Sequence, residues 1–144
     1  MRAAETGLFE DEWDVSKADD GAFIIRTLAK FPGEAARARH PILIVVRWKY
    51  GDEASGMPDA ETLATMVQFE DALYESLDDE WGVEAATVIG DGAKEWRFYT
   101  SKADTFYAGF NEALAGHQRY PVELEPFEDP NWCGLAELLP GEQA

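Results

Sequence analysis

The chain has 144 residues, the size of a single domain. It carries 12 Lys and Arg against 29 Asp and Glu, a net charge of -17 with both His neutral. A field of that sign repels phosphate, so the composition argues against a general nucleic-acid binder and against binding to anionic membranes. Apolar residues make up 46% of the chain and include five Trp, eight Phe and five Tyr, so the chain is expected to fold.

Two features of the sequence predict where the protein is located. The single cysteine, Cys133, has no partner for an internal disulfide, and nothing else points to an oxidising compartment. The longest strongly apolar run, residues 42–46, is too short to span a bilayer, and the first five residues lead into acid rather than into a signal-peptide core. We therefore expect a cytoplasmic protein without a membrane segment.

The first fifty residues predict a hairpin, a loop and a central strand. Residues 1–11 lack periodicity and are expected to be a flexible N-terminus, followed by a single α+β domain over 12–140. From Trp13 apolar and polar residues alternate, a turn is predicted at 19–21, and 22–29 is a second apolar run, which together indicate a β-hairpin. Residues 31–41 are rich in Pro, Gly, Ala and Arg and predict a loop with a short helical turn. Residues 42–50 are β-branched and aromatic and predict a central strand.

A helix, a hairpin and a second helix are predicted next. After Pro58, apolar residues recur at helical spacing, at Leu63, Met66, Val67, Leu73, Leu77 and Trp81. Two apolar runs, 83–89 and 93–100, flank Gly90, Asp91 and Gly92, a strong hairpin signal. Ser101 and Asp104 approximate a capping box for a second helix that closes near Gly116, with an apolar stripe at Phe106, Phe110, Ala113 and Leu114.

The last segments complete a known topology. Residues 120–127 alternate and predict a strand, and Asp129 begins a tail with a short helical turn through Leu139, stopped at residues 140–141. From residue 42 the order is βαββαβ, which predicts a ferredoxin-like antiparallel sheet with two helices on one face, plus the N-terminal hairpin and the helical tail. In that arrangement 42–50 and 93–100 are central neighbours, and 120–127 borders the first of them.

Alternation along the strands assigns the two faces of this sheet. Trp48, Trp96 and Phe98 share the face that meets the helices. The opposite, open face carries the candidate binding residues, which are Arg47, Lys49, Glu95, Arg97 and Tyr99. Leu43 and Val45 on the same face need cover, which the hairpin, the tail or a second subunit could provide.

The charged residues of this open face have two interpretations. Residues 35–51 contain four basic and no acidic residues, which fits an anion-recognising patch on an open sheet face. The alternative is a cross-strand ladder in which Glu123 and Glu125 of the bordering strand, with Glu95, offset the arginines, each pair contributing about 0.2–1 kcal/mol. The alternation of sign favours the ladder.

The sequence contains few patterns that are typical of a catalytic or metal-binding site. His40 and His117 lack another His or Cys at ligand spacing, so no zinc site is predicted. The acidic clusters lack a calcium-loop pattern, no serine lies in a nucleophile-elbow context, and the Gly-rich segments do not match a phosphate loop. Cys133 is interpreted as a small packing residue. No catalytic residue and no cofactor is predicted.

Several segments carry a family resemblance. Residues 95–100, Glu-Trp-Arg-Phe-Tyr-Thr, and 129–132, Asp-Pro-Asn-Trp, are the most specific, with 13–15, 47–50, 56–58 and 69–70 in the same order. Over about residues 12 to 133 the chain resembles the bacterial domain-of-unknown-function family 695, which implies a fold and no activity. In layout and charge alone it is more remotely similar to the regulator B proteins that bind and inhibit ribonuclease E.

We therefore expect a non-enzymatic protein-binding or regulatory domain. Its acidity favours a basic protein partner, such as a nucleic-acid-processing protein, and disfavours generic nucleic acid and membranes. The alternative is an enzyme or small-anion binder that uses the charged open face in a pocket beneath the loop 51–58. A homodimer through the open face is a third hypothesis.

Overall fold

The computed structural model describes residues 13–18, 23–28, 30–51, 56–78 and 80–139. Four predictions therefore lie wholly or partly outside the described residues. They are the flexible start at 1–11, the turn at 19–21, residues 52–55 of the loop 51–58, and the stop at 140–141.

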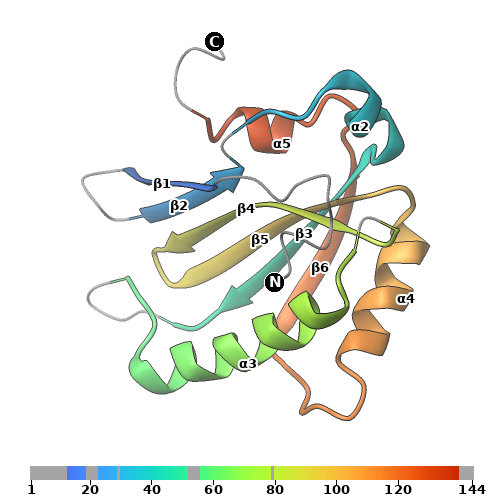
Figure 1. The fold of residues 1–144 in the computed structure, drawn as a ribbon. Helices are drawn as coiled ribbons and strands as arrows, with labels where there is room; N and C mark the ends of the chain where they lie inside the picture. Colours follow the sequence, from blue (N-terminus) through green and yellow to red (C-terminus); the bar gives the residue numbers. More distant parts are fainter. Residues whose placement is uncertain (1–12, 19–22, 29, 52–55, 79, 140–144) are drawn as a thin grey trace.

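Six strands form one antiparallel sheet in the order β1-β2-β4-β5-β3-β6 (Figure 1). They are β1 (Trp13–Ala18), β2 (Phe23–Leu28), β3 (Ile42–Lys49), β4 (Val83–Gly90), β5 (Ala93–Thr100) and β6 (Val122–Glu128). The helices are α2 (Glu34–Arg39), α3 (Ala60–Ser76), α4 (Ala103–Ala113) and α5 (Cys133–Ala136). The prediction of an α+β domain with an antiparallel sheet is confirmed.

The six-strand order differs from that of a four-stranded ferredoxin-like sheet. The predicted neighbours are present, since β3 pairs with β5 on one side and with β6 on the other. The N-terminal hairpin, however, does not cover a face. It extends the sheet, because β2 pairs antiparallel with β4. This pairing satisfies an edge of β4 that would otherwise leave its backbone groups unpaired.

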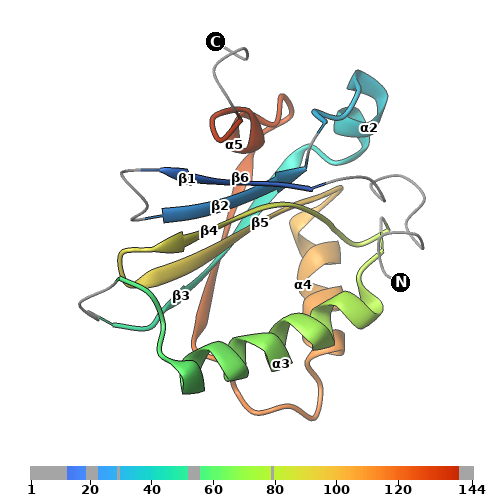
Figure 2. The ribbon, with the colours of Figure 1, turned by 60° about the vertical axis from the view of Figure 1, so that its left-hand side comes forward.

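The helices α3 and α4 cover one face of the sheet, and α2 and α5 lie on the other side (Figure 2). The predicted parity is confirmed on the helix side, where Trp48, Trp96 and Phe98 are buried against Phe69 and Phe106. Aromatic edges meet faces across this layer, with the Phe69 and Trp96 rings 5.1 Å apart at 66°. Such pairs add to the stabilisation from buried area.

The long helix α3 buries a narrower stripe than predicted. Asp59 caps it by accepting a hydrogen bond of 2.8 Å from the Thr62 amide, which lowers the pKa of the Asp59 carboxyl. Met66 and Leu73 are buried as expected, and the buried stripe also includes Phe69. Leu63 and Val67, predicted to face the core, are exposed instead. They lie on the flank of the helix, since the stripe centred on Phe69 fills the space above the sheet.

The start of α4 also differs from the prediction. Its N-cap is Lys102, with no side-chain capping bond, so the capping box of Ser101 and Asp104 is wrong. Ser101 stands one residue too early in the chain to cap this helix. The apolar stripe is confirmed by the buried Phe106 and Phe110.

The tail side of the sheet has a second, smaller core. Leu43 and Tyr99 of the sheet are buried there with Trp132 and Leu135 of the C-terminal segment. The predicted helical turn is present as α5, and it starts after Trp132, whose backbone is left-handed at φ 58, ψ 42. The C-terminal tail, residues 129–139, is therefore one cover of this face.

Candidate functional site

The charged face is built by the pairing of β3 with β5. This register places Arg47 opposite Glu95, and Arg97 follows two residues later on the same face. The Arg47 Nη2 and Arg97 Nε groups each lie 2.7 Å from one of the two Glu95 oxygens. Burial opposes ionisation of Glu95, but the hydrogen bonds from both arginines outweigh it and lower the pKa of this carboxyl. Glu95 is therefore a carboxylate bridge between the two guanidinium groups.

Arg97 continues this row into the C-terminal tail. Its Nη1 donates to the Gly134 carbonyl oxygen at 2.5 Å and to the Glu137 carboxylate. Burial opposes its charge, but the bonds to Glu95 and Glu137 raise the pKa of Arg97. A side chain on Gly134 would not fit here, since a Cβ would lie 2.8 Å from Leu43 Cδ2 and 2.9 Å from the Tyr99 hydroxyl. Arg97 thus fastens the tail to the sheet.

Tyr99 is fully buried beneath the same tail. Its ring stacks on Trp132, with centroids 3.9 Å apart and planes 6° apart, and its hydroxyl donates to Asp129 Oδ2 at 2.7 Å. Burial, and then this hydrogen bond to a carboxylate, raise the pKa of Tyr99. The face that was expected to be open is therefore covered at this end, by one of the three covers that the sequence allowed.

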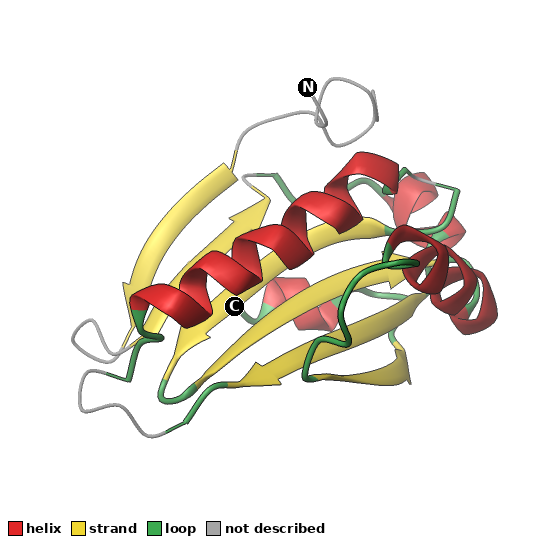
Figure 3. Cartoon of the chain, turned by 90° about the horizontal axis from the view of Figure 1, so that it is seen from below, coloured by secondary structure: helices red, strands yellow, loops and turns green. Residues whose placement is uncertain are grey.

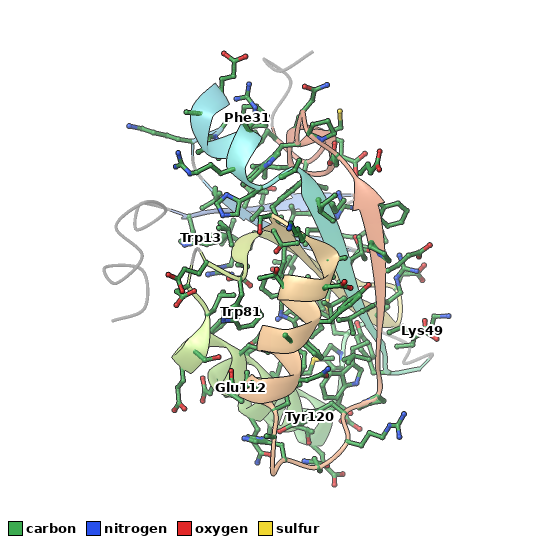
Figure 4. All side chains as sticks on the ribbon, turned by 90° about the vertical axis from the view of Figure 1, so that its right-hand side faces the viewer. Trp13, Phe31, Lys49, Trp81, Glu112 and Tyr120 are labelled. Carbon is green, nitrogen blue, oxygen red and sulfur yellow. The ribbon has the colours of Figure 1, made fainter. Side chains whose placement is uncertain are left out.

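The rest of the charged face is in solvent. Lys49 is exposed and projects away from the helices (Figure 4). Glu123 lies opposite Arg47 and Glu125 opposite Val45 in the register, as predicted. In the described part of the chain, neither glutamate forms an ion pair, so Glu95 alone provides the ladder between the arginines.

A second polar cluster, which the sequence did not single out, lies beneath α3. The buried Glu84 of β4 is only 3% exposed. Its Oε2 accepts from the Tyr74 hydroxyl at 2.7 Å, and its Oε1 lies 3.5 Å from Arg26 Nη1. Burial and the neighbouring Glu84 charge raise the pKa of Tyr74. An acid facing the helices within the apolar run 83–89 is the signal that could have found this cluster.

Contacts of this cluster show which part of the sheet lies below the flank of α3 that carries Leu63 and Val67. Tyr74 meets Glu84 of β4, and Glu70, one turn earlier, binds Lys94 at 2.6 Å and the Trp96 indole at 2.9 Å. Leu63 and Val67 lie on this flank by helical spacing. The flank therefore looks toward the side of the sheet that β2 and β1 extend.

Beyond this flank, none of the described helices covers the hairpin on this side of the sheet (Figure 3). Figure 3 shows α3 crossing the sheet diagonally, with β1 and β2 beside it rather than beneath it. Val15 pairs with Arg26 in the register, and Arg26 contacts Glu84, so Val15 belongs to the helix-side face. Val15, Leu63 and Val67 are 66%, 47% and 45% exposed. We call these three residues, with Trp13 and Arg26 at their edge, the hairpin-side surface.

The residues considered for catalysis or metal binding are either hydrogen-bonded within the fold or exposed to solvent. His40 is buried, with Nδ1 3.2 Å from the Ala36 carbonyl oxygen. The interpretation of Cys133 as a packing residue is wrong, because α5 turns this side chain into solvent. Within the described ranges, no group of three or more His, Cys, Asp or Glu side chains is arranged to hold a metal ion.

Comparison with known proteins gives a family and no activity. Residues 11–139 match the family described as "Family of unknown function (DUF695)". No curated protein and no solved structure matches the chain. Among the helices that the structure describes, none has the length and apolarity needed to cross a bilayer.

Proposed function

Since the chain belongs to the DUF695 family, whose function is unknown, we propose from its geometry that it is a protein-binding module whose partner docks on the hairpin-side surface. The observation that carries this proposal is the exposure of Val15, Leu63 and Val67 on one side of an acidic domain. Burying such side chains gains about 25 cal/mol per Å² of apolar surface, and exposed apolar patches commonly mark interaction sites.

The charges around this surface favour a basic partner. Asp71 and Glu75 follow Val67 along α3, Asp78 comes just after the helix, and all three are exposed. None of them forms an ion pair with another described residue. Two cations beside this surface, Arg26 and Lys94, already bind Glu84 and Glu70. The occupant that fits is an amphipathic protein segment with apolar side chains on one face and Lys or Arg beside them.

The charged face offers less support for a ligand site. Both oxygens of Glu95 are bound, and Arg97 is committed to Glu95 and to the tail. The exposed groups that remain are Lys49 and part of Arg47. Anion binding, catalysis or dimerisation at this face stays a prediction that no contact described above favours.

We also infer a ferredoxin-like unit within the larger sheet, formed by β3 to β6 with α3 and α4. Its support is the pairing of β5 with both β3 and β4, the pairing of β3 with β6, and the two helices on one face. The similarity to regulator B proteins remains an expectation from layout and charge. It agrees with a regulatory binding role and adds no residue to the argument.

A labelled helical peptide of Leu and Lys tests the proposed surface, with the same peptide carrying Glu in place of Lys as the charge control. We expect saturable binding of the Lys peptide by fluorescence anisotropy, weakened by salt. Val67→Gln should weaken binding about tenfold, or about 1.4 kcal/mol, because it removes apolar contact without changing charge. Phe127→Gln on β6 is the matched control, since Phe127 is 44% exposed on the opposite edge strand.

Three results would contradict the proposal. They are equal binding of the Glu peptide, no effect of Val67→Gln, or an equal effect of Phe127→Gln. Self-association in sedimentation that Val67→Gln abolishes would identify a second copy of the chain as the occupant and overturn the basic partner.

A further inference from the structure

A cavity of about 400 Å³ opens between the C-terminal end of α4 and the start of β6. Figure 4 views this side of the molecule, with Tyr120 at the lower end of α4. The floor is apolar and consists of Phe110, Leu114, Val122 and Leu124. Ligand pockets in proteins span roughly 300–1,000 Å³ and combine such a floor with a few polar groups.

The polar groups of this cavity come from one short segment and the last turn of α4. Asn111, His117, Gln118 and Arg119 are exposed along the cavity wall. The buried Tyr120 carries its hydroxyl 3.0 Å from His117 Nδ1. This hydrogen bond connects the exposed imidazole to the aromatic layer, where Tyr120 packs against Trp48 and Phe69. The wall is therefore attached to the main core.

Arg119 is the distinctive member of this wall. It belongs to a chain with 29 acidic and 12 basic side chains, yet no carboxylate of the described residues forms an ion pair with it. The carboxylates nearest in sequence, Glu123, Glu125 and Glu112, do not line the cavity. A guanidinium presents a planar fork of donors that matches a carboxylate.

We propose that this cavity binds a small organic acid, with its apolar body against Phe110 and Leu114 and its carboxylate on Arg119. The overall negative charge disfavours anions in general, so binding depends on this local cation and on the apolar floor together. The cavity shares no residue with the hairpin-side surface, so this site is independent of the proposed protein partner.

The site can be tested on the whole chain by calorimetry and by ¹H–¹⁵N correlation NMR spectra. The probes are phenylacetate, phenylacetamide and acetate. Phenylacetate should bind saturably and shift amides within 110–124. Phenylacetamide, which lacks the charge, and acetate, which lacks the ring, should each bind about tenfold more weakly or worse. Arg119→Gln should reduce phenylacetate affinity by a similar factor, whereas Arg39→Gln, an exposed arginine of α2, should leave it unchanged.

Arg119 is exposed, so its replacement is not expected to unfold the protein. The absence of saturable phenylacetate binding would overturn the proposal. Equal affinity for phenylacetamide, equal affinity in Arg119→Gln, or backbone amide shifts that occur only outside residues 110–124 would overturn it as well.

Discussion

The two faces of the sheet are covered by different means. On the helix side, α3 and α4 bury an apolar layer of large aromatic side chains. On the tail side, the C-terminal segment with its helix of four residues is held by specific bonds, among them Tyr99 to Asp129, Arg97 to the Gly134 carbonyl oxygen, and the Trp132 indole to the His40 carbonyl oxygen. A helix that short is not stable alone, so it depends on side chains of the sheet. We expect damage on the helix side to be global and damage on the tail side to remain local.

Trp96→Ala should cause the largest effect, a loss of about 3–5 kcal/mol in the free energy of unfolding. Trp96 is completely buried, so truncation leaves a cavity in the aromatic layer. Urea denaturation would measure the loss, with Phe127→Ala on the exposed edge as the control. An unchanged midpoint for Trp96→Ala would mean that the two faces have been assigned the wrong way round.

Trp132→Ala should cost about 3 kcal/mol or less, because the tail can detach while the helix-side core stays intact. Hydrogen exchange should show lost protection in α5 with the amides of β5 still protected. Trp132→Phe keeps a ring on Tyr99 and removes the 2.8 Å bond to His40, so it should cost only about 1 kcal/mol. Equal loss of protection in β5 would show that the two faces unfold as one unit.

Arg97→Met should cost about 1.5 kcal/mol, because it removes charge-assisted bonds to the tail and leaves the Gly134 carbonyl oxygen without this donor. Arg47→Met is the matched control on the same face. Its partner is the same Glu95, but the Arg47 side chain is 44% exposed, so at most about 1 kcal/mol is expected. If Arg97→Met preserved stability and lowered the affinity for an anion such as inorganic phosphate tenfold, or about 1.4 kcal/mol, the ligand-site interpretation of this face would replace the ladder.

Glu95→Gln should give the smallest and most pH-dependent effect. The pKa of Glu95 is lower in the folded chain than its ordinary value of 4.5, so its contribution is present above that value and is lost as pH falls through the folded pKa. The difference in melting temperature between the wild type and Glu95→Gln should shrink between about pH 7 and about pH 3. A constant difference across this range would rule out an ionised Glu95 as the source.

Alternation and spacing predicted those parts of the fold that depend on local sequence. The faces of β3 and β5, the β4–β5 hairpin and the helix stripe at Phe106 and Phe110 follow from periodicity, and the structure confirms them. Alternation shows on which face of the sheet a side chain lies, but it does not show which strand pairs with which. The pairing of β2 with β4 therefore could not be predicted, since about sixty residues separate the two strands.

The site contacts were harder to predict for the same reason. Sign alternation predicted a ladder with Glu95, Glu123 and Glu125 as partners, and of these only Glu95 pairs with the arginines among the described residues. Arg97 and Gly134 are 37 residues apart, and Arg26 and Glu84 are 58 apart. Only the assembled sheet brings such groups together.

The position of Cys133 makes the tail open to direct observation. It is the only cysteine of the chain, it is exposed, and it follows the residue that stacks on Tyr99. A maleimide fluorophore or nitroxide would attach at this one thiol without any substitution, beside an indole that can quench it. Spectroscopy on the native sequence would then report, in real time, how often the segment leaves the sheet.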